Sequence, residues 1–245
     1  MDAIGVDIGG SGVRVGLVDT TTGTLRSPPQ RRPHETGAPA EGIIDGLRRL
    51  LTAFPEDAPL GVGFPGVVRG SRVETAPNMR STWPFTDMSE ALGREVHLLN
   101  DADAAAAAEH ALGASQGCEG TVLMVTIGTG LGTSLHRNGV LVPNLELGLL
   151  PHPTRGGVIE AHASGRARRE EGLDLPTWAA RFQEALDLYE HWMNPDLIVL
   201  GGGITESWEA WNGLLTTHAP RRRARFGADA GLIGAAVAAS QARGS

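Results

Sequence analysis

The sequence predicts an α/β protein of two lobes, and three observations lead to that prediction. Short apolar, strand-like segments alternate with amphipathic helical segments along the chain. The order strand, glycine-rich turn, strand occurs twice, once near the start of each half. The length of 245 residues is sufficient for two such lobes. We expect one lobe in residues 1–105 and the other in residues 106–227, facing a cleft, with residues 228–245 packing back onto the first.

The first lobe is expected to begin with a hairpin. Its strands cover residues 3–8 and 13–18, and the glycines between them permit a sharp reversal. Residues 27–39 are rich in proline and arginine and lack a period, which predicts a loop or a ragged edge strand. Asp101 or Asp103 is well placed to cap the last helix of this lobe. The other predicted elements are a helix at 40–54, strands at 60–64 and 96–99, and a helix at 102–112.

The second half of the chain repeats this logic. Strands are expected at 121–127, 133–136 and 140–142, and Asn138-Gly139 is a hairpin signal between the last two. The remaining predicted elements are an amphipathic helix at 175–192, a strand at 197–200 that ends in three glycines, and a helix of small residues at 228–240.

The composition excludes several classes of protein. The formal net charge of −7 argues against a nucleic-acid partner. No apolar run approaches the roughly 20 residues that cross a bilayer, and the start does not read as a signal peptide, so we expect a cytoplasmic protein. The single cysteine, Cys118, cannot form a disulfide framework or a multi-cysteine zinc site. All 21 basic residues are arginines, which excludes a P-loop lysine and Schiff-base chemistry.

Three glycine-rich turns, each after an apolar strand, are candidate phosphate sites. Their backbone N–H groups can hold phosphate oxygens because no Cβ blocks the approach. Asp7 ends the first strand and is suited to hold Mg²⁺ through water. The second turn is followed by a strand, so it is not a dinucleotide fingerprint. Taken singly, the first turn is as readily an ordinary hairpin and the third an ordinary strand-to-helix turn, whereas a phosphate-binding hairpin fits the second. The candidate residues are Asp7, Gly9, Gly10, Ser11, Gly12, Arg14, Thr126, Gly128, Thr129, Gly130, Gly202 and Gly203.

Eight segments, in order and spanning nearly the whole chain, carry a resemblance to a known family. They are DIGGSG (7–12), FPGVV (64–68), TAPN (75–78), LNDADAA (99–105), GTGLG (128–132), LVPNLELG (141–148), PDLIVLGGG (195–203) and AGLIGAA (230–236). This pattern resembles the actin-like ATPase and sugar kinase superfamily, most closely the ROK sugar kinases and their polyphosphate glucokinase branch. The resemblance implies a ribonuclease H-like fold in both lobes, a cytoplasmic homodimer, and Mg²⁺-dependent transfer from polyphosphate or ATP to the 6-hydroxyl of glucose or a related hexose.

The resemblance also implies roles for individual residues. Asp101 is the expected catalytic base, which takes the proton from the sugar hydroxyl; without the resemblance, a helix cap is its simpler role. Asn78 and Asn100 correspond to sugar-binding asparagines, and Gly66 belongs to the same sugar site. Glu146 corresponds to a glutamate that accepts hydrogen bonds at the other end of the ring, against the simpler role of an exposed loop acid.

The chain departs from the family pattern beside Glu146. Leu149 replaces the usual histidine, and Pro151 replaces a glutamate of the polyphosphate branch. Fewer polar groups around the ring should weaken or redirect sugar selection, unless His152 or Glu160 takes their place. A zinc site that buttresses the histidine in many relatives is not expected here, since Cys118 alone cannot build one.

Two arginine clusters are candidates for binding a polyanionic donor. They are Arg166, Arg168 and Arg169, and Arg221, Arg222, Arg223 and Arg225. A solvated helix face explains the first cluster equally well, and the sequence does not separate polyphosphate from ATP as donor. A catalytically weak or inactive sugar- or phosphate-binding paralogue stays the alternative to an active kinase, because of Leu149 and Pro151.

Overall fold

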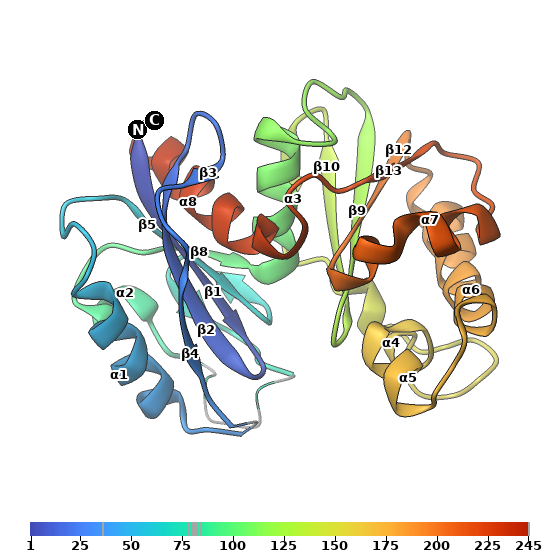
Figure 1. The fold of residues 1–245 in the computed structure, drawn as a ribbon, viewed down its shortest axis with the longest axis horizontal. Helices are drawn as coiled ribbons and strands as arrows, with labels where there is room; N and C mark the ends of the chain where they lie inside the picture. The colour runs from blue at the N-terminus through green and yellow to red at the C-terminus, as the bar shows by residue number, and fades with distance from the viewer. Residues whose placement is uncertain (36, 78, 80–82, 84, 245) are drawn as a thin grey trace. The chain divides into compact units, whose positions relative to one another are not determined.

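The structure is a computed structural model, and it describes residues 1–35, 37–77, 79, 83 and 85–244. The chain divides into two compact units (Figure 1). Unit 1 comprises Met1–Leu112 and Asp229–Ser245, and unit 2 comprises Gly113–Ala228. The boundary that the sequence suggested, at residue 105, lies inside a helix of unit 1. No helix within the described ranges is long and apolar enough to span a membrane.

Unit 1 is built on a sheet with the strand order β3-β2-β1-β5-β8, and β4 also pairs with β2. β1 and β2 are antiparallel, whereas β1, β5 and β8 run parallel, so their carboxyl ends share one edge. The strands are β1 (Asp2–Gly9), β2 (Gly12–Asp19), β3 (Thr24–Leu25), β4 (Gln30–Pro33), β5 (Leu60–Phe64) and β8 (His97–Asn100), with a separate hairpin of β6 (Val68–Arg69) and β7 (Arg72–Val73). The helices are α1 (Ala40–Leu51), α2 (Met88–Leu92), α3 (Asp101–Leu112) and α8 (Ala230–Arg243).

The last helix of the chain, α8, completes unit 1. Figure 1 shows this red helix beside the blue strands of the amino-terminal hairpin. Its backbone lies so close to the sheet that a Cβ at Gly5 or Gly61 would overlap a carbonyl oxygen of α8. Gly234 of α8 in turn meets the backbone of α3 at Ala104. The small residues of the predicted helix therefore permit close packing, as expected.

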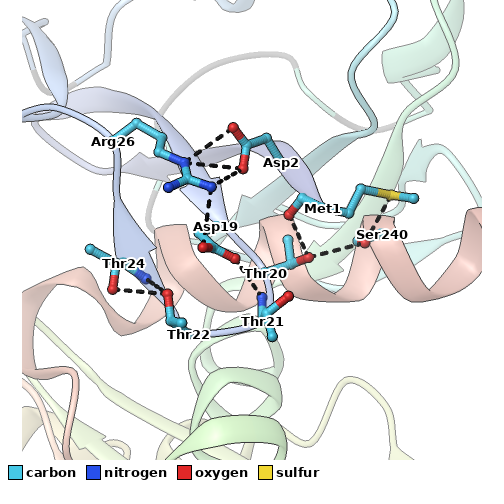
Figure 2. A network of polar contacts seen from close by, with 9 residues as sticks. All are labelled: Met1, Asp2, Asp19, Thr20, Thr21, Thr22, Thr24, Arg26 and Ser240. Atoms are coloured by element: carbon cyan, nitrogen blue, oxygen red, sulfur yellow. Dashed lines mark hydrogen bonds and ion pairs between the residues drawn. The ribbon is translucent and has the colours of Figure 1, made fainter.

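Polar contacts also tie this hairpin to its surroundings (Figure 2). Arg26 forms ion pairs with Asp2 (Nη2 to Oδ1, 2.6 Å) and Asp19 (Nη2 to Oδ2, 3.1 Å). The Thr20 hydroxyl lies 3.3 Å from that of Ser240 on α8. These contacts hold the start of β1 and the end of β2 next to the last helix.

Unit 2 repeats the plan of unit 1. Its sheet has the order β11-β10-β9-β12-β13, with an antiparallel β9–β10 hairpin and β9, β12 and β13 parallel. The strands are β9 (Thr121–Ile127), β10 (Leu131–Arg137), β11 (Val140–Val142), β12 (Leu197–Gly201) and β13 (Arg221–Arg223). The helices are α4 (Glu160–Ala163), α5 (Gly165–Glu170), α6 (Leu175–Met193) and α7 (Trp208–Trp211), with short 3₁₀ turns such as η1 (Leu147–Leu149).

An aromatic cluster anchors the core of unit 2. Trp178 and Phe182, on α6, stack with ring centroids 5.3 Å apart, and Trp211 meets Trp178 edge-on. All three side chains are fully buried. The indole N–H of Trp178 donates to the carbonyl oxygen of Ala163, so its one polar atom is satisfied. This core holds α4 and α6 against the sheet that carries the second glycine turn.

Candidate functional site

The first glycine turn joins β1 to β2. Asp7 faces Arg14 across the hairpin, and Gly9 pairs with Gly12 at its end. A Cβ at Gly12 would press on the carbonyl oxygen of Arg32 in the neighbouring strand β4. The predicted turn is therefore present, with Gly10 and Ser11 at its tip.

Arg14 lies between two carboxylates. Its guanidinium donates a hydrogen bond to Asp229, and Nη1 is 3.9 Å from Oδ2 of Asp7. Burial is the main influence on the pKa of the Asp7 carboxyl, and it raises that pKa. The positive charges of Arg14 and Arg31 lower the pKa of Asp7, whereas the negative charge of Asp229 raises it. Asp7 is thus a desolvated acid beside a cation that it shares with Asp229.

Asp101 follows β8 and begins α3, at the carboxyl edge of the parallel strands. Its carboxylate is half-buried, and Oδ1 accepts the N–H of Ala102 at 2.8 Å. Gly231 of α8 lies between the two acids: a Cβ there would be 3.4 Å from Oδ1 of Asp7 and 3.9 Å from the carbonyl oxygen of Asp101. Unit 1 thus brings together Asp7 and Asp101, which 93 intervening residues separate in sequence.

Asn100, not an aspartate, makes the main cap of α3. Its Oδ1 accepts the N–H groups of Ala102 (2.9 Å) and Asp103 (3.2 Å), and its Nδ2 donates to the carbonyl oxygen of Gly66 (3.2 Å). The prediction that Asp101 or Asp103 caps this helix is therefore wrong for the main cap. Asn100 is the residue directly before the helix, which is the position that caps it. The Asn100 side chain, 2% exposed, is fixed in orientation.

The other sugar-site candidates of the first unit lie around Gly66. A Cβ at Gly66 would overlap the carbonyl oxygen of Thr75, so only glycine fits at this close approach. Asn78 lies outside the described residues.

Glu146 immediately precedes η1 in unit 2, and its side chain is half-buried. The following turn is held against β10: the N–H of Leu147 donates to the Thr133 hydroxyl at 3.0 Å, and a Cβ at Gly148 would overlap the carbonyl oxygen of Leu131. The segment that carries Glu146 is thereby fixed on the strand that follows the second glycine turn.

The second glycine turn closes the β9–β10 hairpin, with the N–H of Gly128 bonded to the carbonyl oxygen of Gly130 at 3.0 Å. Thr129 is exposed at its tip, and Thr126 is half-buried on β9. Glu160 stabilises the end of this turn, since its Oε2 accepts the N–H of Leu131 at 3.0 Å. Because β10 follows, the exclusion of a dinucleotide fingerprint is confirmed.

The third glycine turn lies next to the second. Gly201 pairs with Thr126 across β12 and β9. Gly202 has φ = 87°, and a Cβ there would overlap the backbone of Ile127, so both conformation and space require glycine. Gly203 faces open space. Unit 2 therefore presents two neighbouring glycine turns at one end of its sheet.

Neither predicted substitute for the missing family side chains is available. His152 is buried: its Nδ1 accepts the N–H groups of Thr154 and Arg155, and its Nε2 lies 3.4 Å from Oε2 of Glu184. Glu160 is 6% exposed and is bonded to the glycine turn. Because both side chains are buried and engaged in these hydrogen bonds, His152 stabilises its own loop and Glu160 stabilises the second glycine turn.

Sequence reasoning missed Asp229, and it considered Glu160 only for the sugar site, not as a support of the second glycine turn. Asp229 stands directly before a helix of small residues, where an acid is a common helix start, so the sequence offered no reason to pair it with Arg14. Glu160 follows two apolar residues, and this pattern signals burial but not its partner.

The chain is similar to known proteins over nearly its full length. The model of the ROK family matches residues 3–143. The chain is 35% identical to the polyphosphate glucokinase of Mycobacterium tuberculosis, over 96% of this chain and 89% of that protein.

Two solved structures have the same fold. The inorganic polyphosphate/ATP-glucomannokinase from Arthrobacter sp. strain KM is 34% identical with a TM-score of 0.90, covering 98% of this chain and 99% of that one. A ROK family glucokinase from Streptomyces griseus, in complex with glucose and AMPPNP, is 26% identical with a TM-score of 0.78, covering 98% and 100%. These likenesses confirm the fold class predicted from the sequence.

Proposed function

The chain belongs to the ROK family, and we propose that it is a sugar kinase, which transfers a phosphoryl group from polyphosphate or ATP to the 6-hydroxyl of glucose or a related hexose. The relatives named above, a polyphosphate glucokinase and a polyphosphate/ATP-glucomannokinase, support this activity. The observation that carries the proposal is the placement of Asp101 and Asp7 at one edge of the unit 1 sheet, with α8 next to both.

Asp101 is the catalytic base of the proposed reaction. Its half-buried carboxylate takes the proton of the sugar hydroxyl while that oxygen attacks the terminal phosphorus and the bond to the rest of the donor breaks. Asn100 and Gly66 are assigned to the sugar site next to Asp101. The hydrogen bonds of Asn100 to Gly66 and to the start of α3 fix the orientation of its side chain. Asn78 and Glu146 are assigned hydroxyl contacts on the strength of the family motif.

The donor phosphates are assigned to the glycine turns. In unit 1 these are Gly9, Gly10, Ser11 and Gly12 with Arg14, and in unit 2 they are Thr126, Gly128, Thr129, Gly130, Gly202 and Gly203. The exposed Thr129 hydroxyl and the open space at Gly203 support this assignment. Both polyphosphate and ATP carry the phosphate oxygens that such turns bind.

Asp7 fits a Mg²⁺ ion. The structure shows a half-buried carboxylate to which no described residue donates a hydrogen bond, and whose pKa is raised by burial. A bound cation offsets the free-energy cost of burying the ionised carboxylate. Mg²⁺ in phosphate sites binds through one or two carboxylates, with water and phosphate as its other ligands. When bound, Mg²⁺ would neutralise charge on the donor phosphates; Asp7 would hold it directly or through water.

The test is a matrix of sugars against donors. Glucose and mannose are each combined with ATP and long-chain polyphosphate, with and without Mg²⁺, and the sugar 6-phosphate is measured. Product in at least one Mg²⁺-containing combination, and none when Mg²⁺ is chelated, is the expected result. We further propose a homodimer, which sedimentation would show, and a cytoplasmic location, where both donors occur.

A catalytically weak sugar- or phosphate-binding paralogue is the second candidate function. The half-buried Leu149 stands in the 3₁₀ turn after Glu146, and His152 is held within its own loop, so two polar groups of the family pattern are not supplied. Calorimetric binding of glucose without turnover by any donor would favour this candidate over the kinase.

A further inference from the structure

We propose that the arginines of helix α5, Arg166, Arg168 and Arg169, bind the trailing phosphates of a long-chain inorganic polyphosphate donor. The inference rests on the proposed function, because it assigns the second glycine turn to the donor. It goes further by naming the residues with which the protein distinguishes a polyphosphate chain from ATP.

Helix α5 begins against the second glycine turn. The backbone N–H of Arg166 donates to the carbonyl oxygen of Gly128 at 3.2 Å, and a Cβ at Gly165 would meet that same oxygen at 2.8 Å. Ser164 caps the helix by accepting the N–H of Ala167 at 3.1 Å. Glycine at 165 therefore permits an approach that fixes the α5 arginines next to the turn.

The three guanidinium groups have no protein partner within the part of the chain that the structure describes: no hydrogen bond or ion pair joins their side chains to another residue. The Nε atom of Arg168 is buried and has no hydrogen-bond partner. Arg169 folds back toward the start of the helix, where its Nη1 lies 3.5 Å from the position of a Cβ on Gly165. Guanidinium groups without protein partners beside this turn are suited to a ligand that brings acceptor oxygens.

Two arginines of unit 2 that lie near α5 in sequence are already engaged. Arg155 is paired with Glu184, and Arg181 is paired with Glu171, the residue that follows α5. Glu170, the last residue of α5, is exposed and forms no ion pair within the described residues. Asp174 caps α6, and its pKa is lowered mainly by the hydrogen bonds that it accepts from Thr177, with a smaller contribution from Arg168. The positive charge of α5 is therefore not neutralised by ion pairs.

The second arginine cluster is less suited to the same role. Arg221 bonds to Asn212, Thr217 and Leu215, and burial lowers its pKa. Arg222 donates to the carbonyl oxygen of Ala114 at 2.8 Å. Arg225 lies over the ring of Phe226, with its Cζ 5.3 Å from the ring centroid. Within the described residues, Arg223 is the one member of this cluster whose side chain forms no hydrogen bond or ion pair. Three of its four arginines are thus engaged, so of the two clusters that the sequence offered, α5 is favoured.

The chemistry distinguishes the two donors. A polyphosphate chain continues beyond the transferred group with one anionic phosphate after another, and arginine pairs with such oxygens through two parallel hydrogen bonds. ATP ends in a nucleoside, which offers no comparable charge. Removing the α5 charges should therefore impair long-chain polyphosphate and leave ATP largely unaffected.

The test is the double variant R166Q/R169Q, with R168Q as a separate variant. The control is R49Q/R69Q, which removes two exposed arginines of unit 1 and so makes the same change in net charge. KM and kcat are measured for long-chain polyphosphate, tripolyphosphate and ATP at low and moderate salt. We expect KM for long-chain polyphosphate to rise by roughly tenfold or more in the double variant, because charged hydrogen bonds are lost. KM for ATP, kcat, and all values of the control should change little.

Equal KM values for long-chain polyphosphate in the double variant and the unaltered protein would overturn the inference. So would an equal rise for polyphosphate and ATP, since α5 would then merely support the turn. Circular dichroism checks the fold, and R169Q alone, at an exposed position, serves if the double variant unfolds. If the unaltered protein uses no donor at all, the proposed function fails. Calorimetric titration with long-chain polyphosphate then decides the inference: binding lost in R166Q/R169Q supports it, and no binding overturns it.

Discussion

The guanidinium of Arg14, on β2, donates a hydrogen bond to the carboxylate of Asp229, which lies 215 residues further along the chain. The same guanidinium lies 3.9 Å from the carboxylate of Asp7. Asp229 directly precedes α8, so this ion pair connects the first glycine turn to the start of the last helix. A substitution of Asp229 therefore changes the electrostatic environment of Asp7, because Arg14 interacts with both carboxylates.

Replacing Asp229 with Asn should shift the acid limb of the pH–rate profile. The negative charge of Asp229 raises the pKa of Asp7, and the substitution also releases Arg14 to pair with Asp7. Both effects lower the pKa of Asp7, so its ionised form persists to lower pH and the acid limb of kcat/KM moves to lower pH. The control is D45N, which removes an exposed partner of Arg48. An unchanged acid limb in D229N would show that Asp7 does not govern it.

Replacing Asp7 with Asn should lower activity while stabilising the fold at neutral pH. Burial raises the folded-state pKa of Asp7, so between its unfolded and folded pKa values the folded protein binds more protons than the unfolded chain. The stability contributed by this group is greatest at low pH and falls as pH rises through that window. D7N removes the ionisable group, and with it the free-energy cost of keeping an ionised carboxylate buried at neutral pH. Its Tm should therefore exceed that of the unaltered protein at pH 7. The difference in Tm should become smaller toward acid pH. Thermal unfolding across pH tests this, and a lower Tm at pH 7 would contradict it.

Replacing Asp101 with Asn should reduce kcat by roughly 10²–10⁴-fold, the range for a lost general base. The amide oxygen still accepts the N–H of Ala102, and Asn100 still caps α3, so Tm should barely change. D87N is the control, because Asp87 also accepts backbone N–H groups at a helix start, those of Ser89 and Glu90 in α2, and has no proposed role in the reaction. Near-native turnover by D101N would reduce Asp101 to a structural residue.

Replacing Leu149 with His should improve glucose use. Leu149 is half-buried directly after Gly148, and the unaltered protein is expected to bind glucose weakly and to accept mannose. An imidazole restores a hydrogen-bonding group beside the turn that carries Glu146, so kcat/KM for glucose should rise relative to mannose. L214H, at an exposed leucine, is the control. Tight and strictly glucose-selective binding by the unaltered protein would contradict this account of the sugar site.

The longer strands of this protein were predictable because their apolar runs are bounded by glycine, proline or other turn residues. The predicted ranges for β5, β9 and β11 match the structure to the residue. β3, β6, β7 and β13 were not predicted. The first three have two residues each, and β13 consists of three arginines and forms through backbone pairing with β12. Tertiary pairing overrides local propensity at such an edge.

The candidate site was predictable where a motif is continuous in sequence and not where it depends on distant contacts. The glycine turns and the position of Asp101 were correctly placed at strand ends. The Arg14–Asp229 pair and the support of Leu131 by Glu160 join residues from separate elements, and no local pattern encodes such pairs. The helices α4 and α5 were missed because four and six residues are too few to show a helical period.

The packing of α8 on Gly5 and Gly61 has a consequence for how the chain acquires its fold during synthesis. The ribosome makes all of unit 2 before it makes α8, so β1 and β5 are left with an uncovered face while residues 113–228 emerge. Domains usually fold in the order in which they are translated. Here the first unit to be started is the last to be finished, and unit 2 is the part that can reach its native packing while translation continues.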